Sequence, residues 1–286
     1  MNYKFFITIF TIFILISITL SPVSALDSNN LTDGLSNDNA QKINTLFDYL
    51  SDNNQGRDTY AIIAALDFEV ELLKNSLEDM EEVDIIGTPA YKGRIGNHNV
   101  VVMQCGMGKV SAGAGTQALI DRFHPDYIIN TGCAGGIGKD LEIGDIVVSD
   151  SVIEWDLDLR NLGYPLGYVD SLGQVEMKAD KKLADKIVAS IPNNETVVRG
   201  LVVSGDQFVS TEDQMNQILT YFPNALCTEM EGAAVGHVCT QNNVPFCVIR
   251  SISDSADSES DVDYAEFSKI SSEKSAAWLV KMLKEN

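Results

Sequence analysis

Three acidic residues that are far apart in the chain stand where apolar runs end or where helices are expected to begin. Glu69 follows the first apolar run after residue 60, Glu231 precedes a run of small residues, and Asp254 ends a second apolar run. Carboxyl groups exchange protons with substrates, and an ionised carboxylate accepts hydrogen bonds from a sugar diol. Ordinary interpretations exist too, because acids are favoured at helix N-termini and in surface turns. Asp254 is the least easily explained in this way, since an acid ending a buried strand needs a partner.

Two glycine-containing segments follow strand-like runs, where the backbone could approach a ligand. Residues 131–136 read Thr-Gly-Cys-Ala-Gly-Gly, and residues 106–109 read Gly-Met-Gly-Lys. Taken alone, the first segment favours a tight turn, and it lacks the Gly-Lys-Ser/Thr ending of a phosphate-binding loop. The second is compatible with an anion site at a helix N-terminus or with a plain strand-to-helix turn.

The apolar pattern predicts a scaffold in which strands alternate with helices. Strands are expected at residues 60–66, 90–95, 98–104, 127–131, 146–153, 196–204 and 246–253, the second and third forming a hairpin. Helices are expected from residue 67 and at 109–122, 178–190, 231–242 and 265–284. The sequence therefore predicts a single α/β domain with a central mixed, mostly parallel sheet flanked by helices. Such sheets bind ligands at the carboxyl ends of their strands.

The composition argues against several classes of partner. The formal net charge of −21 repels nucleic-acid phosphates and anionic lipid head groups. Three scattered histidines disfavour a histidine metal site, so neither a metal nor a cofactor is expected. Five cysteines without a CxxC pair indicate buried free thiols, with at most one bridge, rather than a disulfide framework.

The first 59 residues differ from the remainder. Residues 1–25 have a positive start, an apolar core and the small-x-small pattern Val23-Ser24-Ala25, as in a secretory signal peptide. Residues 26–59 are polar and predict a linker with one short amphipathic helix. We therefore expect an exported protein, periplasmic, secreted or on the cell surface, whose functional domain spans 60–286. An uncleaved signal would leave it anchored to a membrane, and a cleaved one would leave no stable membrane contact.

Seven short segments occur together in the order and approximate spacing of one known family. They are Ala65-Leu66-Asp67-Phe68-Glu69-Val70, Cys105-Gly106-Met107-Gly108-Lys109-Val110, Asn130-Thr131-Gly132-Cys133-Ala134-Gly135-Gly136, Gly144-Asp145-Ile146-Val147-Val148-Ser149-Asp150, Ser204-Gly205-Asp206-Gln207-Phe208, Glu229-Met230-Glu231-Gly232-Ala233 and Arg250-Ser251-Ile252-Ser253-Asp254. Over residues 60–284 the chain resembles the 5′-methylthioadenosine/S-adenosylhomocysteine nucleosidases of the purine and uridine phosphorylase superfamily. Seven segments in register are far more specific than any one of them.

The resemblance implies a nucleoside phosphorylase-like fold and an N-glycosidic hydrolase that binds an adenine nucleoside and releases adenine. Glu69 would activate the attacking water, which Arg250 would position, and Asp254 would protonate or hydrogen-bond adenine N7. Glu231 would hold the ribose diol. Further contacts are implied for the sugar and base with Met230, Phe208, Val209, Ala134, Gly135 and Ser253, and for the 5′ substituent with Met107 and Tyr264.

The chemistry explains why such a set is needed. Bond cleavage builds positive charge on the ribose and negative charge on adenine, so it needs an acid at N7 and a base for water. Burial would raise the pKa of Asp254 and suit it as the acid. The acidic strand end at residues 66–69 would repel phosphate, which favours hydrolysis over phosphorolysis. A purine nucleoside phosphorylase and a nucleoside-binding protein without catalysis remain as alternatives.

The chain departs from the family at two positions. Cys133 stands where the bacterial enzymes commonly have Ser, and Leu162 stands where an aromatic residue of the partner subunit usually closes the 5′ pocket. Residues 155–168 diverge generally, so the sequence leaves open whether methylthioadenosine or S-adenosylhomocysteine is preferred. The resemblance also implies a homodimer in which this segment contributes across the interface.

Overall fold

The computed structural model describes residues 57–256 and 260–285, so the expected signal peptide and linker helix lie outside the described residues. The strands are β1 (Thr59–Ala64), β2 (Glu78–Ile85), β3 (Thr88–Ile95), β4 (His98–Gln104), β5 (Tyr127–Gly136), β6 (Ile146–Glu154), β7 (Met177–Lys178), β8 (Val197–Ser204), β9 (Ala225–Glu229) and β10 (Phe246–Asp254). The helices are α4 (Asp67–Asn75), α5 (Lys109–Phe123), α6 (Lys181–Ser190), α7 (Glu212–Tyr221), α8 (Gly232–Asn242) and α9 (Ser260–Glu285), with a 3-10 turn, η2 (Arg160–Leu162). Among these helices, none has the length and apolar character that a membrane span requires.

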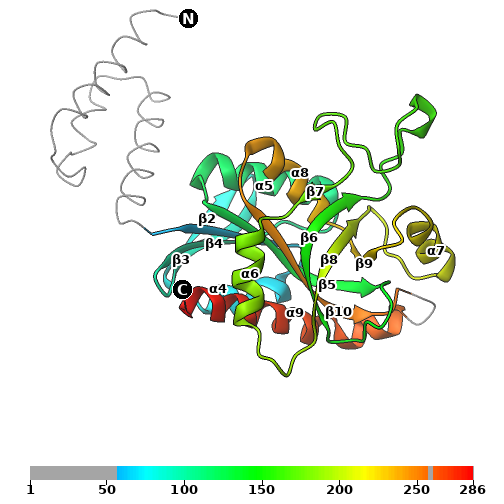
Figure 1. Cartoon of the computed structure of the whole chain (residues 1–286). Coiled ribbons are helices and arrows are strands. Elements are labelled where there is room, and N and C mark those ends of the chain that lie inside the picture. The colour runs from blue at the N-terminus through cyan, green and yellow to red at the C-terminus, as the bar shows by residue number, and fades with distance from the viewer. Residues whose placement is uncertain (1–56, 257–259, 286) are drawn as a thin grey trace, which may run out of the picture. The chain divides into compact units, whose positions relative to one another are not determined.

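The strands form one mixed sheet that closes on itself at one end (Figure 1). Parallel pairings link β4, β1, β5 and β10, and separately β6, β8 and β9. Antiparallel pairings join β10 to β6 and β5 to β9, so these two groups complete a ring. Strands β3 and β2 extend the open edge beyond β4. The predicted mixed sheet flanked by helices is confirmed.

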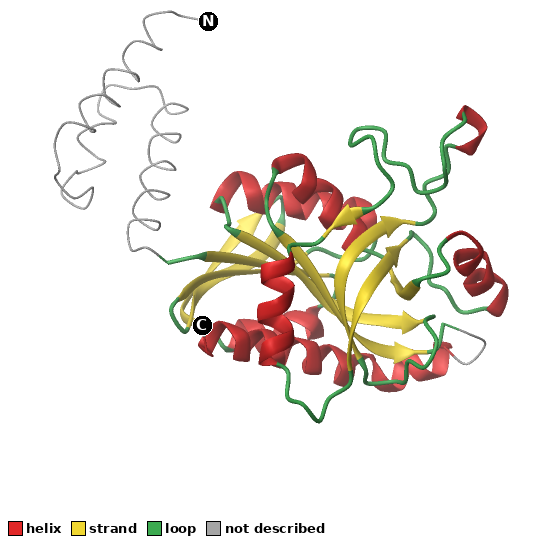
Figure 2. Ribbon diagram, in the orientation of Figure 1, coloured by secondary structure: helices red, strands yellow, loops and turns green. Residues whose placement is uncertain are grey.

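Helices cover both faces of the sheet (Figure 2). Val70 of α4 and Leu279 of α9 belong to one apolar cluster, which α6 also joins. Leu119 of α5 and Val235 of α8 belong to the cluster on the other face. Successive residues of β1 alternate between these two clusters, as expected for a strand buried on both sides. Helix α7 packs on a smaller cluster that contains Trp155.

Most predicted elements agree with the structure, and the differences have local causes. The helix expected from residue 178 begins at Lys181, because residues 177–178 pair with β6 and Asp180 caps the helix by accepting a hydrogen bond from Leu183 N. Strand β5 continues to Gly136 instead of ending at residue 131. All five cysteines are free thiols, as the sequence indicates.

Candidate active site

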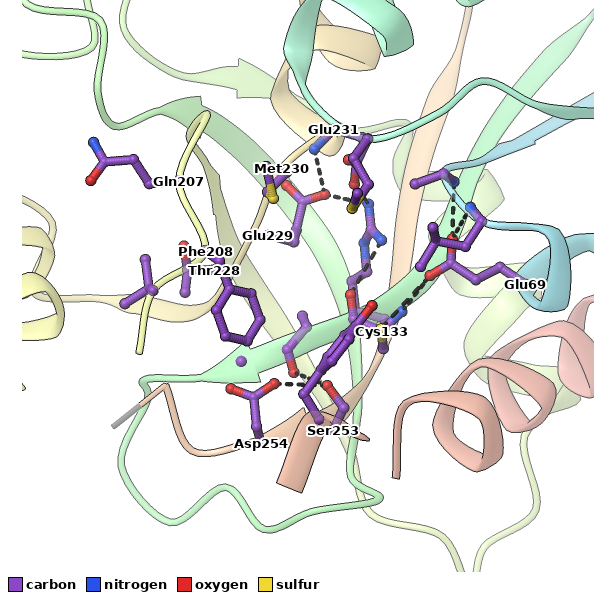
Figure 3. Close-up of a pocket in the computed structure, with 18 residues that line it drawn as sticks. Glu69, Cys133, Gln207, Phe208, Thr228, Glu229, Met230, Glu231, Ser253 and Asp254 are labelled. Atoms are coloured by element: carbon purple, nitrogen blue, oxygen red, sulfur yellow. Dashed lines mark hydrogen bonds and ion pairs between the residues drawn. The ribbon is translucent and has the colours of Figure 1, made fainter. Parts of the chain in front are cut away.

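One pocket lies where several strands reach their carboxyl ends, and it gathers side chains from across the domain (Figure 3). Every residue that the sequence predicts for the site lines it: Glu69, Met107, Ala134, Gly135, Phe208, Val209, Met230, Glu231, Arg250, Ser253, Asp254 and Tyr264. The lining also includes Ala65, Leu66, Cys133, Gln207, Thr228 and Glu229. The structure therefore brings the predicted residues together, while the role assigned to each of them stays a prediction.

Glu69 is held at the first turn of α4 by the backbone around it. Its Oε2 accepts hydrogen bonds from Ala65 N and Leu66 N, both at 2.9 Å, and its Oε1 accepts one from Cys133 N at 3.3 Å. The Cys133 Sγ lies 3.7 Å from the same Oε1. Burial raises the pKa of Glu69 above its ordinary value, although Arg250 and these backbone N–H groups oppose the shift. A carboxylate with a raised pKa is well suited to take a proton from water.

Arg250 on β10 places a buried positive charge among carboxylates. The residue is 1% exposed. Its Nη2 donates to Glu229 and lies 3.5 Å from Glu231 Oε2, while its Nη1 donates to Cys133 O at 3.3 Å. Burial would lower the pKa of Arg250, but Glu229, Glu231 and Glu69 outweigh it and raise this pKa. The guanidinium therefore stays charged and offsets part of the negative charge of the pocket.

Glu231 stands at the N-cap position of α8, and its side chain reaches across to a different element. Its Oε1 accepts a hydrogen bond from Gly108 N at 2.8 Å. Burial raises the pKa of Glu231 to about 7, with Arg250 opposing the shift and Glu229 adding to it. The carboxyl group is thus fixed in the pocket wall, where it can accept hydrogen bonds from a ligand diol.

Asp254 is buried, so its interpretation as a surface turn acid is wrong. It is 2% exposed. Its Oδ2 accepts a hydrogen bond from Ser253 Oγ at 2.8 Å, and its Oδ1 accepts one from Ala256 N at 3.0 Å. These bonds fix the orientation of the carboxyl group. Figure 3 shows Asp254 and Glu69 on opposite sides of the pocket, where they could act on opposite sides of one bond.

Aromatic side chains supply a flat surface in the same pocket. The rings of Phe208 and Tyr264 meet edge to face, with their centres 5.4 Å apart. Phe208 is 42% exposed, whereas Val209 beside it is buried. An exposed aromatic face in a pocket favours stacking of a planar ligand such as a purine base.

The glycines of β5 allow buried side chains to approach the strand closely, so the tight-turn interpretation of residues 131–136 is wrong. A Cβ at Gly132 would collide with Arg250 Nη1 and would lie 2.6 Å from Glu69 Oε1. A Cβ at Gly135 would lie 2.8 Å from Asp254 Oδ1. The glycines therefore make room for the predicted catalytic side chains, and the strand continues without a turn.

The turn before α5 binds carboxylates of the protein itself. Gly108 N donates to Glu231 Oε1, and Lys109 N donates to Asp206 Oδ1 at 2.8 Å. The predicted alternatives were an anion site and a plain turn, and the observed turn combines them. Its backbone N–H groups hold two acidic side chains, one of which lines the pocket.

Glu229, at the end of β9, is the functional candidate that the sequence does not single out. Its Oε2 accepts hydrogen bonds from Glu231 N at 3.0 Å and Gly232 N at 2.8 Å, and its Oε1 accepts one from Ser204 Oγ. Together with its ion pair to Arg250, these bonds join the start of α8 to β10. The only signal was a Glu-x-Glu spacing before a helix, which is too common to assign a role.

Comparison with known proteins finds relatives that match most of this chain. The family model of the phosphorylase superfamily matches residues 59–284. A 5′-methylthioadenosine/S-adenosylhomocysteine nucleosidase of Haemophilus influenzae strain PittEE is 40% identical over 224 residues, which are 78% of this chain and 97% of the relative. The solved nucleosidase of Neisseria meningitidis in complex with methylthio-immucillin-A has a TM-score of 0.78 and 34% identity, and covers 80% of this chain and 100% of its own. The Colwellia psychrerythraea enzyme in complex with adenine has a TM-score of 0.77 and 36% identity, over 79% and 95%.

Proposed function

This chain belongs to the phosphorylase superfamily and, within it, to the 5′-methylthioadenosine/S-adenosylhomocysteine nucleosidases, and from that premise we propose the reaction that its pocket performs. The protein hydrolyses the N-glycosidic bond of methylthioadenosine, S-adenosylhomocysteine or both, and releases adenine. The observation that carries this proposal is the meeting of Glu69, Glu231 and Asp254 in one pocket beside Arg250. Each residue type matches one requirement of the reaction.

The residues divide the reaction between two sides of the sugar. Glu69 takes a proton from water as the water oxygen bonds to C1′ of the ribose. The C1′–N9 bond breaks, its electron pair passes to adenine, and Asp254 supplies or shares the proton at N7. Glu231 holds the ribose diol, and its negative charge stabilises the cationic sugar of the transition state. Proton transfer of this kind typically contributes about 10²–10⁴ in rate.

The charge of the pocket supports water over phosphate as the nucleophile. The described lining contains the carboxylates of Glu69, Glu229, Glu231 and Asp254, and Arg250 is the cation among them. Since Arg250 already pairs with Glu229, a phosphate dianion would meet mainly negative charge. A water molecule has no net charge, so the carboxylates do not repel it.

Substitution of Asp254 tests the proposed acid. We expect the wild-type protein to release adenine from methylthioadenosine without phosphate, and Asp254→Asn to lower kcat at least about 100-fold, because an amide has no carboxyl proton to share. Adenine release is followed spectroscopically or by chromatography, with Asp121→Asn as a control on the exposed surface of α5.

The same assay separates the alternative functions. Release that requires phosphate would identify a phosphorylase, and tight nucleoside binding without release would identify a binding protein. Wild-type activity in Asp254→Asn would remove this residue from the mechanism.

We further propose that the protein acts as a homodimer. The segment that carries η2 projects from the domain (Figure 1), and Leu162 at its end is 73% exposed. A second copy is the partner that the family resemblance implies for this segment. Light scattering during size-exclusion chromatography is expected to give twice the chain mass; a monomer with full activity would contradict the proposal.

A further inference from the structure

Three segments at the mouth of the pocket are tied together by a closed set of polar contacts, which we call the loop brace: Lys109, Asp156 and Asp206. Lys109 Nζ contacts Asp156 Oδ1 at 2.6 Å. Asp156 Oδ2 accepts a hydrogen bond from Asp206 N at 2.8 Å, and Asp206 Oδ1 accepts one from Lys109 N at 2.8 Å. The contacts therefore return to their starting residue and link the turn before α5, the segment after β6 and the loop between β8 and α7.

Burial makes the charged part of the loop brace stronger than an ordinary surface ion pair. The side chains of Lys109 and Asp156 are 15% and 17% exposed, and Glu154 adds a second contact to Lys109 Nζ at 3.1 Å. Burial would lower the pKa of Lys109, but these two carboxylates outweigh it and raise this pKa. Charges that are largely shielded from water attract more strongly and are screened less by salt.

Two members of the loop brace, Lys109 and Asp206, are close in sequence to residues that hold or line the pocket wall. Gly108, next to Lys109, donates its N–H to Glu231 Oε1. Phe208 follows Asp206 by two residues and lines the pocket, yet 42% of it is exposed, so its own packing fixes it only in part. The loop also lies close against the segment after β6, because a Cβ at Gly205 would collide with Trp155.

We infer that Lys109, Asp156 and Asp206 are positioning residues, which set the distance between the ribose contact at Glu231 and the stacking surface of Phe208. This inference rests on the proposed function of the pocket. Release of the loop would misplace Phe208 for substrate and transition state alike, while Glu69 and Asp254 would keep their places. A loss of that kind raises KM and leaves kcat nearly unchanged.

Asp206→Ala is the decisive variant, because it removes the acceptor of Lys109 N from an exposed residue outside the core. We expect KM for methylthioadenosine and the dissociation constant of adenine to rise about tenfold, in line with the loss of one charge-assisted hydrogen bond. We expect kcat to change less than about twofold under the same reasoning. Asp206→Asn should recover most of the affinity, since its amide oxygen can still accept from Lys109 N. Asp213→Ala, on the exposed first turn of α7, is the matched control.

Three measurements on the whole chain test the positioning role of the loop brace: steady-state kinetics, adenine titration calorimetry and thermal unfolding. Unchanged affinity in Asp206→Ala, an equal fall in kcat, or an Asn variant no better than Ala would overturn the inference. If Asp206→Ala unfolds, Asp206→Glu gives the same test, because its longer side chain displaces the loop and should also raise KM. A wild-type protein that binds adenine but releases none would contradict the proposed function alone, and the adenine affinities would still test the loop brace.

Discussion

At the scale of single residues, the site is governed by an imbalance of buried charge. Glu69, Glu229 and Glu231 surround the guanidinium of Arg250, so one positive charge faces three carboxyl groups. Ionised carboxylates are costly to bury unless they are paired. Burial raises the pKa values of Glu69 and Glu231, because it favours their neutral forms, and Arg250 opposes the shift only in part.

These shifts predict an acid limb in the pH profile at an unusually high pH. Glu69 must be ionised to accept a proton, and Glu231 must be ionised to stabilise the cationic sugar. Since their pKa values are raised, that of Glu231 to about 7, protonation begins at a higher pH than for ordinary carboxyl groups. We expect kcat/KM to fall as the pH drops below neutrality, measured between pH 4.5 and 9. Glu231→Gln should lower activity, because a neutral amide cannot stabilise the cationic sugar; a wild-type profile that is flat down to pH 5 would contradict this account.

How far the sequence predicts the site differs from residue to residue. Glu69, Glu231 and Asp254 could be assigned because each stands in a distinct segment of the family pattern. Glu229 could not, because two of its partners, Ser204 on β8 and Arg250 on β10, are distant in the sequence and meet it only in the folded chain. Nor does the sequence reveal that Lys109 contacts Asp156, which is 47 residues away.

At the scale of elements, the sequence pattern predicted those strands and helices that are determined by residues close together in the chain. The apolar runs predicted β1 and β10, and also the hairpin of β3 and β4. The pattern did not indicate β2, α7 or β9. The strand β2 is mostly exposed and acidic, and β9 is five residues long and is held by pairing with β8 and β5. Closure of the ring depends on such distant pairings, so no periodicity predicts it.

The close approach between β5 and the candidate catalytic residues can be tested by substitution of one glycine. In Gly132→Ala, the added methyl group would push Arg250 and Glu69 out of place. We expect kcat/KM to fall at least about 100-fold, since displacements near 1 Å cost this much when they affect reacting groups. Steady-state kinetics and thermal unfolding test this expectation. Gly113→Ala on α5 is the control, because a Cβ there meets only Val238 Cγ2 at 3.7 Å, an ordinary contact distance. Near wild-type kinetics would show that the close approach is unnecessary.

At the scale of the whole molecule, the composition of the domain and the first 25 residues have separate consequences. The chain has 41 acidic residues against 20 Lys and Arg, and a net charge this far from zero favours solubility. We propose that residues 1–25 direct export and that cleavage follows Ala25, so that the mature protein begins at Leu26.

N-terminal sequencing of the protein from the extracytoplasmic fraction tests this proposal. Leu26 is the expected first residue, and Ala25→Lys should block cleavage, because a long charged side chain does not fit the small-residue pattern. Mature protein that retains Met1 and stays in the cytosol would contradict the proposal.

The five free thiols have a consequence for where this protein can become active. Four of the cysteines are buried and none is cross-linked, so oxidation contributes no covalent bond to the native state. Disulfide formation ordinarily restricts the folding of secreted domains to oxidising compartments. This domain has no such restriction, because its native state contains no disulfide, so reducing and oxidising surroundings are expected to give the same native structure.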